Sequence, residues 1–291
     1  MTFLVIFSCL AAERFLLHYQ FLRRAHWFER WLELHQSLPI SHGLREGRAG
    51  LILLLLPPLL AVTLLQTLFD GLLLGIPGIL FAALVLLYSL GPEDLDSQIA
   101  EWVEAGGPDD PAKTGAFAAE LLEKRMDAGD PDLGRELADG VLSAALQRSF
   151  AVLFWFLVLG PVGALGYRLA REARSLAREQ GRHGLGEPIR ALLFLLDWLP
   201  ARMLVGLFAL GGCFEPAVQG WRHCDPAPDL DANASLVSCA GAGALQLNAA
   251  SDGDTGEPAT TRVEAAMALV WRSLVIFVAL LGLATISGWI L

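Results

Sequence analysis

The chain has 291 residues, of which 54% are hydrophobic, and its mean hydropathy is +0.50. These values are too high for a soluble domain of this length and predict an integral membrane protein. The formal net charge is −10, so no nucleic-acid partner is expected.

The first segment, residues 1–49, begins with the apolar stretch TFLVIFSCLAA. This stretch is short for a membrane crossing and lacks the basic start of a secretory leader, so we expect an interfacial helix that is not cleaved. By the positive-inside rule, six arginines place the rest of the segment in the cytoplasm. They are Arg14, Arg23, Arg24, Arg30, Arg45 and Arg48.

Three runs, at 51–69, 71–90 and 268–291, reach the roughly 20 apolar residues that a bilayer core requires. Two more, at 150–169 and 191–212, are long enough but are interrupted by GPVGALG and DWLPAR. We therefore predict an all-α, multi-pass membrane protein with three full transmembrane helices and two broken or re-entrant helical segments. Five ordinary transmembrane helices are the alternative.

These elements divide the chain into six parts. The N-terminal segment is followed by a transmembrane hairpin, an acidic cytoplasmic helical insert, the broken membrane segments with an Arg-rich connector, a loop rich in Pro, Gly and Asp, and a last transmembrane helix. After residues 1–49, the predicted boundaries are 50–90, 91–148, 149–213, 214–265 and 266–291.

The insert at 91–148 carries 14 acidic residues against 5 basic ones. Its apolar residues recur at helical spacing, for example in SQIAEWVEAG and GAFAAELLEKRM, which predicts short amphipathic helices laid against the membrane domain. We expect the acidic side chains to form a solvated face. A docking surface for another protein is the alternative.

The segment 168–190, from the end of the first interrupted run to the start of the second, contains six arginines and three glutamates. Its arginines are Arg168, Arg171, Arg174, Arg178, Arg182 and Arg190. A full crossing by 150–169 would carry this segment to the outside, against the positive-inside rule. Re-entrant segments would keep it in the cytoplasm, and both arrangements place the C-terminus outside.

Two ionisable residues, Asp197 and Arg202, flank Pro200 within an apolar run. A charge inside a membrane segment costs several kcal/mol unless it is paired or hydrated. On a straight helix the two residues lie about 140° apart, so we expect a break at Pro200 to bring them together. The pair then forms either a buried salt bridge that holds the bend or a ligand site.

Gly160, Gly163 and Gly166 recur every three residues ahead of Tyr167. We expect close helix packing there, with approach of the backbone to a phosphate as the alternative. Tyr167 and Arg168 together suit an anchor at the membrane interface. The arginines that follow at helical spacing would bind lipid headgroups or an anionic ligand.

The four cysteines, Cys9, Cys213, Cys224 and Cys239, stand singly and form no C-x-x-C pair. We expect unpaired thiols in a reducing cytoplasm and no metal site. The segment 214–265 is rich in Pro, Gly, Ala and Asp and is predicted to be a loop. No motif of a known catalytic site appears, so no catalytic residue is assigned.

Three stretches together resemble the AmpE family of bacterial inner-membrane proteins, and the likeness extends over nearly the whole chain. They are AERFLL at 12–17, LFWFLVLGPVGALGYRLARE at 153–172 and FLLDWLPARM at 194–203. The resemblance implies a multi-pass protein of the inner membrane with a role in β-lactamase induction and peptidoglycan recycling.

The AmpE family is itself similar to the CobD/CbiB family, whose members carry out an ATP-dependent amide ligation. The acidic and Asn positions of that family correspond here to Ser143, Ala144 and Gln147, and its paired acids to Leu193 and Phe194. Without these carboxylates the chain lacks the ligands for a metal that neutralises phosphate, so ligase activity is not expected. A membrane-embedded enzyme of the CobD/CbiB type or of a diverged activity remains the alternative.

The sequence therefore predicts a regulatory or sensory protein that binds an anionic ligand in a cytoplasm-facing cavity. The ligand is a muropeptide, a nucleotide or a phospholipid; membrane lipids are the other expected partners, and no cofactor is expected beyond a possible nucleotide. A rival hypothesis is an enzyme that uses Asp197 as a base, and another is a scaffold. The predicted ligand-binding residues are Asp197, Arg202, Arg168, Arg171, Arg174, Tyr167, Gly160 and Gly163.

Overall fold

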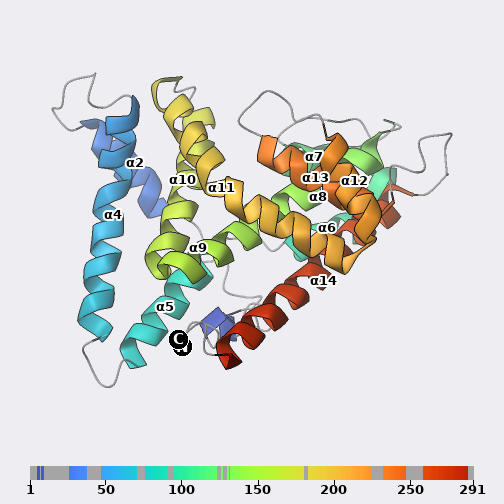
Figure 1. The fold of residues 1–291 in the computed structure, drawn as a ribbon. Helices are drawn as coiled ribbons and strands as arrows, with labels where there is room; N and C mark the ends of the chain where they lie inside the picture. Colours follow the sequence, from blue (N-terminus) through green and yellow to red (C-terminus); the bar gives the residue numbers. More distant parts are fainter. Residues whose placement is uncertain are drawn as a thin grey trace. The chain divides into compact units, whose positions relative to one another are not determined.

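In the computed structural model, helices are the only regular secondary structure of the described residues (Figure 1). The structure describes residues 26–37, 47–70, 76–90, 95–122, 132–179, 183–224, 232–246 and 258–287, together with residues 5, 6, 8, 9, 126 and 130. Two compact units divide the chain, and each is described separately. The first comprises Met1–Pro92, Ala151–Leu196 and Ala284–Leu291, and the second comprises Glu93–Phe150 and Asp197–Leu283.

Four of the described helical stretches are long and apolar enough to cross a membrane: Gly47–Phe69, Leu133–Leu159, Leu185–Gly211 and Ala259–Ile286. A shorter apolar helix, α5, covers Ile76–Ser89. The all-α, multi-pass class predicted from the sequence is therefore confirmed.

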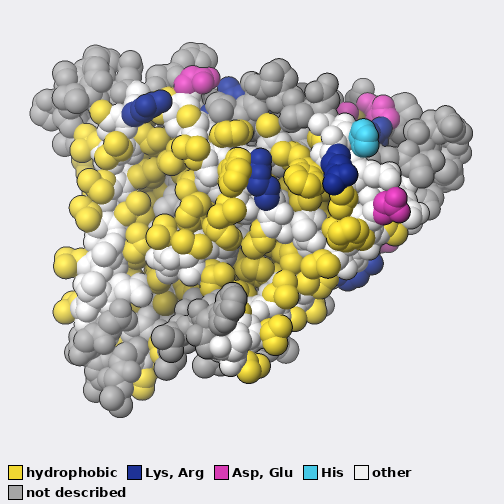
Figure 2. Space-filling view, in the orientation of Figure 1, with side chains coloured by type: hydrophobic (Ala, Val, Ile, Leu, Met, Phe, Trp, Pro, Cys, Tyr) yellow, Lys and Arg dark blue, Asp and Glu magenta, His cyan; other side chains and the backbone are white. Residues whose placement is uncertain are grey.

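In the first unit, α10 packs against α4, α5 and α9. The helices of this unit are α2 (His26–Ser37), α4 (Gly47–Asp70), α5, α9 (Ala151–Leu159), α10 (Pro161–Glu179) and the first part of α11 (His183–Gly211). A row of large apolar side chains runs along α4 at every fourth position and is exposed, as expected of a face that meets lipid. Figure 2 shows hydrophobic side chains over much of the visible face. These side chains are Ile52, Leu56, Leu60, Leu64 and Leu68.

Helix α4 stays helical through Pro57 and Pro58. Pro58 has no backbone N–H, so the carbonyl of Leu54, four residues earlier, loses its donor within the helix. The indole N–H of Trp31, on α2, donates a hydrogen bond of 3.0 Å to this carbonyl. A neighbouring helix thus supplies the donor that the proline removes.

The second unit contains the acidic insert and the segments that follow α11. Its other helices are α6 (Leu95–Glu104), η3 (Gly107–Asp109), α7 (Pro111–Leu122), α8 (Leu133–Ala145), η4 (Leu146–Phe150), α12 (Phe214–His223), α13 (Ala232–Ala244) and most of α14 (Ala259–Ile286). As predicted, the insert is helical. Its acidic side chains also have structural partners, which the expectation of a solvated face did not include.

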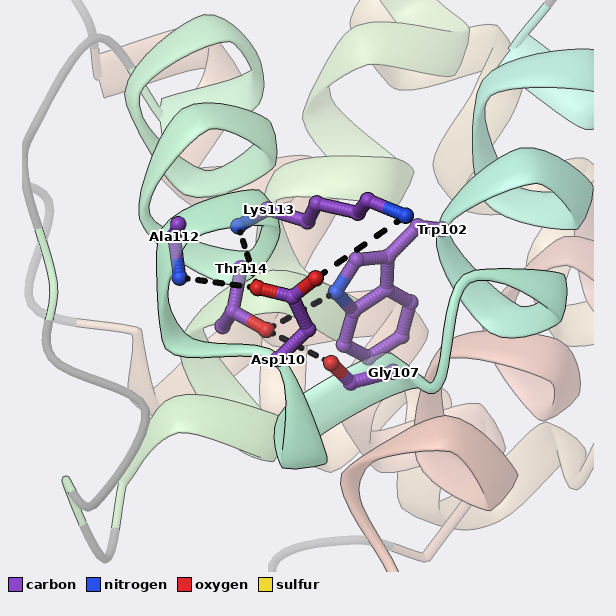
Figure 3. A network of polar contacts seen from close by, with 6 residues as sticks. All are labelled: Trp102, Gly107, Asp110, Ala112, Lys113 and Thr114. Carbon is purple, nitrogen blue, oxygen red and sulfur yellow. Dashed lines mark hydrogen bonds and ion pairs between the residues drawn. The ribbon is translucent and has the colours of Figure 1, made fainter.

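Around the start of α7, Asp110 caps the helix by accepting hydrogen bonds from the backbone N–H groups of Ala112 and Lys113, at 3.1 and 3.2 Å (Figure 3). Behind this cap the Trp102 indole donates to the Thr114 hydroxyl, which donates to the Gly107 carbonyl. These contacts tie α6, η3 and α7 into one module.

The interrupted run predicted at 150–169 is divided differently in the structure. One apolar stretch runs from Leu133 to Leu159 through α8, η4 and α9 and ends at Gly160. The sequence-based start at 150 came too late because the charged residues of α8 lower its hydropathy, although its other face is buried. The wider helical turn of η4 joins α8 to α9 without a loop.

The prediction of a loop throughout 214–265 is wrong for three stretches: two form α12 and α13, and residues 259–265 belong to α14, which begins before the predicted boundary at 266. Alanine favours helix, and small residues let two helices approach closely, which outweighs the cost of the glycines. A Cβ at Gly220 would meet the Cys239 carbonyl, and one at Gly243 would meet the Pro216 carbonyl. Residues 225–231 and 247–257 of the predicted loop lie outside the described residues.

The expectation of four unpaired thiols is also wrong. Cys224 and Cys239 form a disulfide between the end of α12 and the middle of α13. Cys9 and Cys213 are free, the first buried and the second exposed. Spacing in the sequence does not reveal the pair, because a predicted loop implies no contact between two helices.

We predict that Gly243→Ala or Gly220→Ala lowers stability by about 1–3 kcal/mol, because the added methyl group collides with backbone that cannot move aside. Gly206→Ala is the matched control, since Gly206 lies within α11 and has no atom within 4 Å of the added methyl position. Thermal unfolding of the purified variants in detergent measures the effect. Equal midpoints for all three variants would contradict the close packing of α12 and α13.

Candidate functional site

The predicted ligand-binding residues are divided between the two units. Six belong to the first unit: Gly160, Gly163, Tyr167, Arg168, Arg171 and Arg174. Asp197 and Arg202 belong to the second. We therefore describe two groups: the arginine row of α10 (Arg168, Arg171, Arg174 and Arg178) and the Arg202 centre (Arg202, Trp198 and Asn233).

A glycine–proline turn positions the arginine row. Gly160 has φ of +66°, a left-handed conformation that ends α9, and Pro161 begins α10. A Cβ at Gly163 would meet the carbonyl of Trp155, and one at Gly166 would lie 3.5 Å from Leu59 of α4. Close packing therefore accounts for Gly163 and a turn accounts for Gly160, whereas a methyl group at Gly166 would make only an ordinary van der Waals contact.

The row itself lies at the partly exposed side of α10. Arg168, Arg171 and Arg174 are half-buried and Arg178 is exposed, whereas Tyr167 is only 1% exposed and lies in the core of the unit. An Nη of Arg168 forms an ion pair of 3.2 Å with Glu172, while its Nε is buried without a hydrogen-bond acceptor. Four arginines against two glutamates leave α10 positively charged.

Two aromatic residues that the sequence analysis did not single out adjoin this ion pair. The Trp27 indole, on α2, donates a hydrogen bond of 2.8 Å to the Tyr88 hydroxyl, on α5. Arg168 and Glu172 interact electrostatically with Tyr88. Trp27 and Tyr88 are aromatic residues that lie far from the arginine row in the sequence, so only the fold links them to it.

The predicted break at Pro200 is wrong: α11 is one unbroken helix from His183 to Gly211. The proline again deprives the carbonyl four residues earlier, that of Leu196, of its donor. The indole N–H of Trp155, on α9, donates a hydrogen bond of 3.0 Å to this carbonyl. Because a neighbouring helix replaces the missing bond, α11 continues through the proline.

Because α11 continues through Pro200, Asp197 and Arg202 stand five positions apart on one unbroken helix. Asp197 is 7% exposed and lies on the buried side of the helix, which also carries Leu193 and Leu204. Arg202 lies on the more exposed side, next to Trp198. Asp197 and Arg202 thus lie on different sides of α11.

The Arg202 guanidinium has partners of its own. One Nη donates to the Trp198 carbonyl at 2.7 Å and to the Asn233 side-chain oxygen at 3.1 Å, and the group lies 4.1 Å from the centre of the Trp198 ring. Asn233, on α13, is buried, and its side-chain oxygen accepts the bond from Arg202. These contacts lower the cost of a charge in an apolar helix and join α11 to α13.

Ser143, which the resemblance to the CobD/CbiB family sets at an acidic or Asn position, makes hydrogen bonds within the fold. The Ser143 hydroxyl contacts the Ser238 hydroxyl at 2.7 Å and donates to the Asp139 carbonyl at 3.0 Å. It thus lies in a contact between α8 and α13. Within the described ranges, no group of three or more His, Cys, Asp or Glu side chains could hold a metal ion.

Comparison with known families gives a match over the full length. A family model described as "Regulatory signalling modulator protein AmpE" matches residues 1–291. None of the solved structures matches the chain.

Individual relatives carry two different names. The chain is 29% identical to a cobalamin biosynthesis protein CobD of Stutzerimonas stutzeri (strain A1501) over 246 residues, which cover 77% of this chain and 78% of that protein. It is 30% identical to Protein AmpE of Shigella flexneri over 212 residues, or 70% and 71% of the two chains. Another CobD protein, of Chromobacterium violaceum, is 33% identical over 162 residues, or 47% and 51%.

We predict that Trp155→Phe destabilises the protein by about 1–3 kcal/mol, because the Leu196 carbonyl loses its donor in an apolar environment. The same substitution should cost less in a Pro200→Ala background, where the new amide N–H can bond to that carbonyl. The free energies of unfolding of the original protein, the two single variants and the double variant form a double-mutant cycle that measures this difference. Additive effects would mean that the indole does not compensate for the proline.

Proposed function

Because the chain belongs to the AmpE family of regulatory signalling modulator proteins, we propose that it is a regulatory protein of the bacterial inner membrane that acts in β-lactamase induction. Its input in this proposal comes from peptidoglycan recycling. The membrane-length helices support the membrane location, and the family description supports the regulatory role.

The observation that carries the proposal is the arginine row of α10, which we propose as the ligand-binding surface. Three of its guanidinium groups are half-buried, and the Arg168 Nε is buried without an acceptor. Half-buried guanidinium groups favour an anion because they are less hydrated than ammonium groups and donate in pairs to carboxylate or phosphate. Muropeptides, nucleotides and phospholipids all offer such groups.

One alternative, an enzyme, is favoured by the two relatives named for cobalamin biosynthesis. A ligase of that kind needs carboxylates to hold a metal against phosphate. Ser143, Ala144 and Gln147 provide none at the corresponding positions, so binding without turnover is the function that the residues support best.

The test is a thermal-shift and binding screen of the purified protein with nucleotides, muropeptides and phospholipids. We predict that one of these classes raises the unfolding midpoint and that Arg171→Gln or Arg174→Gln weakens its binding about tenfold or more, since a hydrogen bond to a charged group contributes about 1.5–3 kcal/mol. Arg222→Gln, an exposed arginine of α12, is the matched control and should bind normally.

The outcomes separate the hypotheses. Chemical conversion of a bound ligand would support the enzyme instead. Binding that is unaffected by both α10 substitutions would place the ligand elsewhere, and the absence of binding in all three classes would leave a scaffold protein.

A further inference from the structure

We propose that α12 and α13 form a disulfide-closed hairpin on the periplasmic side of the membrane, at the end of a full crossing by α11. The inference rests on the proposed location in the inner membrane and is independent of the ligand. It reverses the expectation that the segment after residue 213 faces the cytoplasm.

The first observation is the continuity of α11. Its apolar stretch, Leu185–Gly211, has 27 residues without a break. At 1.5 Å per residue this is about 40 Å, longer than the roughly 30 Å hydrocarbon core. A crossing by a helix of this length puts its two ends on opposite sides of the membrane.

The second observation is the charge of the two flanks. The segment before the helix, 168–190, contains six arginines, which places it in the cytoplasm by the positive-inside rule. The segment after it, 214–258, contains one arginine, Arg222, and no lysine. The flank poor in basic residues is therefore the translocated one.

The third observation is the disulfide. Cys224 and Cys239 lie with their Cα atoms 5.9 Å apart, within the range of natural disulfides. Disulfides persist in the bacterial periplasm, whereas thioredoxin and glutathione keep cytoplasmic thiols reduced. The bond therefore agrees with the side that the charges indicate.

The fold brings these two sulfurs together. At one end of the hairpin, the backbone N–H of Cys213 donates a hydrogen bond of 3.0 Å to the Ala244 carbonyl. Along its length, Gly220 and Gly243 let α12 and α13 approach to backbone contact. The disulfide then closes the end nearer the connection between the helices.

The exposed side of α12 indicates that the hairpin stays at the membrane surface. Phe214 and Trp221 are 62% and 41% exposed and lie seven residues apart, on the same side of the helix. Arg222 and His223 follow directly and are exposed. Aromatic and basic residues together are typical of the membrane–water interface, where α11 would leave the bilayer.

The Cys224–Cys239 disulfide forms by thiol–disulfide exchange. A periplasmic oxidase of the dithiol–disulfide class accepts two electrons and two protons from the Cys224 and Cys239 thiols. Its own disulfide becomes two thiols while the Sγ–Sγ bond forms.

Helix α14, which follows the hairpin, then enters the membrane from the periplasmic side.

The bond is tested by counting thiols in the full chain expressed in a Gram-negative cell. Cells are quenched with acid, and the denatured membrane fraction reacts with a maleimide–polyethylene glycol. We expect two adducts without reductant, from Cys9 and Cys213, and four after reduction. Cys224→Ser should give three adducts with or without reductant. The control Cys213→Ser should give one adduct without reductant and three after reduction.

A second experiment tests on which side of the membrane the hairpin lies, without reduction of the disulfide. Cys213 is free and exposed, so an impermeant maleimide should label it in intact spheroplasts. Ser175, exposed on α10, provides the opposite control. Ser175→Cys in a Cys213→Ser background should be labelled only after the membrane is permeabilised.

Four adducts without reductant, or labelling of Cys213 only after permeabilisation, would overturn the proposal. Neither result would bear on ligand binding by the arginine row. A failed binding screen would likewise leave the position of the hairpin unaffected.

Discussion

The fold depends on one constraint, the need of backbone carbonyls in apolar surroundings for a hydrogen-bond donor. Prolines inside α4 and α11 remove the donors of the Leu54 and Leu196 carbonyls, and in both helices a tryptophan indole from a neighbouring helix replaces the missing N–H at 3.0 Å. This substitution lets two crossing-length helices contain proline and remain continuous. It also joins α2 to α4 and α9 to α11 by bonds with a defined direction.

Continuity of α11 in turn decides what Asp197 and Arg202 can do. In the continuous helix the carboxylate of Asp197 lies on the buried side, and the guanidinium of Arg202 lies beside Trp198 and Asn233. Arg202 then connects two helices, and the arginine row that we propose for an anion lies on α10. Small residues perform the same joining task without polar groups, since glycines bring α12 and α13 into backbone contact.

Hydrophobic length and arginine bias were sufficient to predict the class, the crossing-length helices at 51–69 and 268–291, and the positively charged helix after the glycine–proline turn. Pro200 was misread because the effect of a proline depends on whether another helix offers a donor, and Trp155 lies 41 residues away from Leu196. The loop at 214–265 was misread because composition counts glycine as a helix breaker, although glycine between packed helices favours contact. The disulfide, Trp27 and Tyr88 depend on contacts between helices that periodicity does not report.

The two tryptophan–carbonyl bonds also protect the indole N–H hydrogens of Trp31 and Trp155 from exchange with water. An indole N–H that donates to a carbonyl inside a helix pair can exchange its hydrogen with water only when the pair separates. Exchange at Trp31 therefore measures how often α2 leaves α4, and exchange at Trp155 measures how often α9 leaves α11. The prolines thus give this membrane protein two built-in reporters of helix separation, one for each pair.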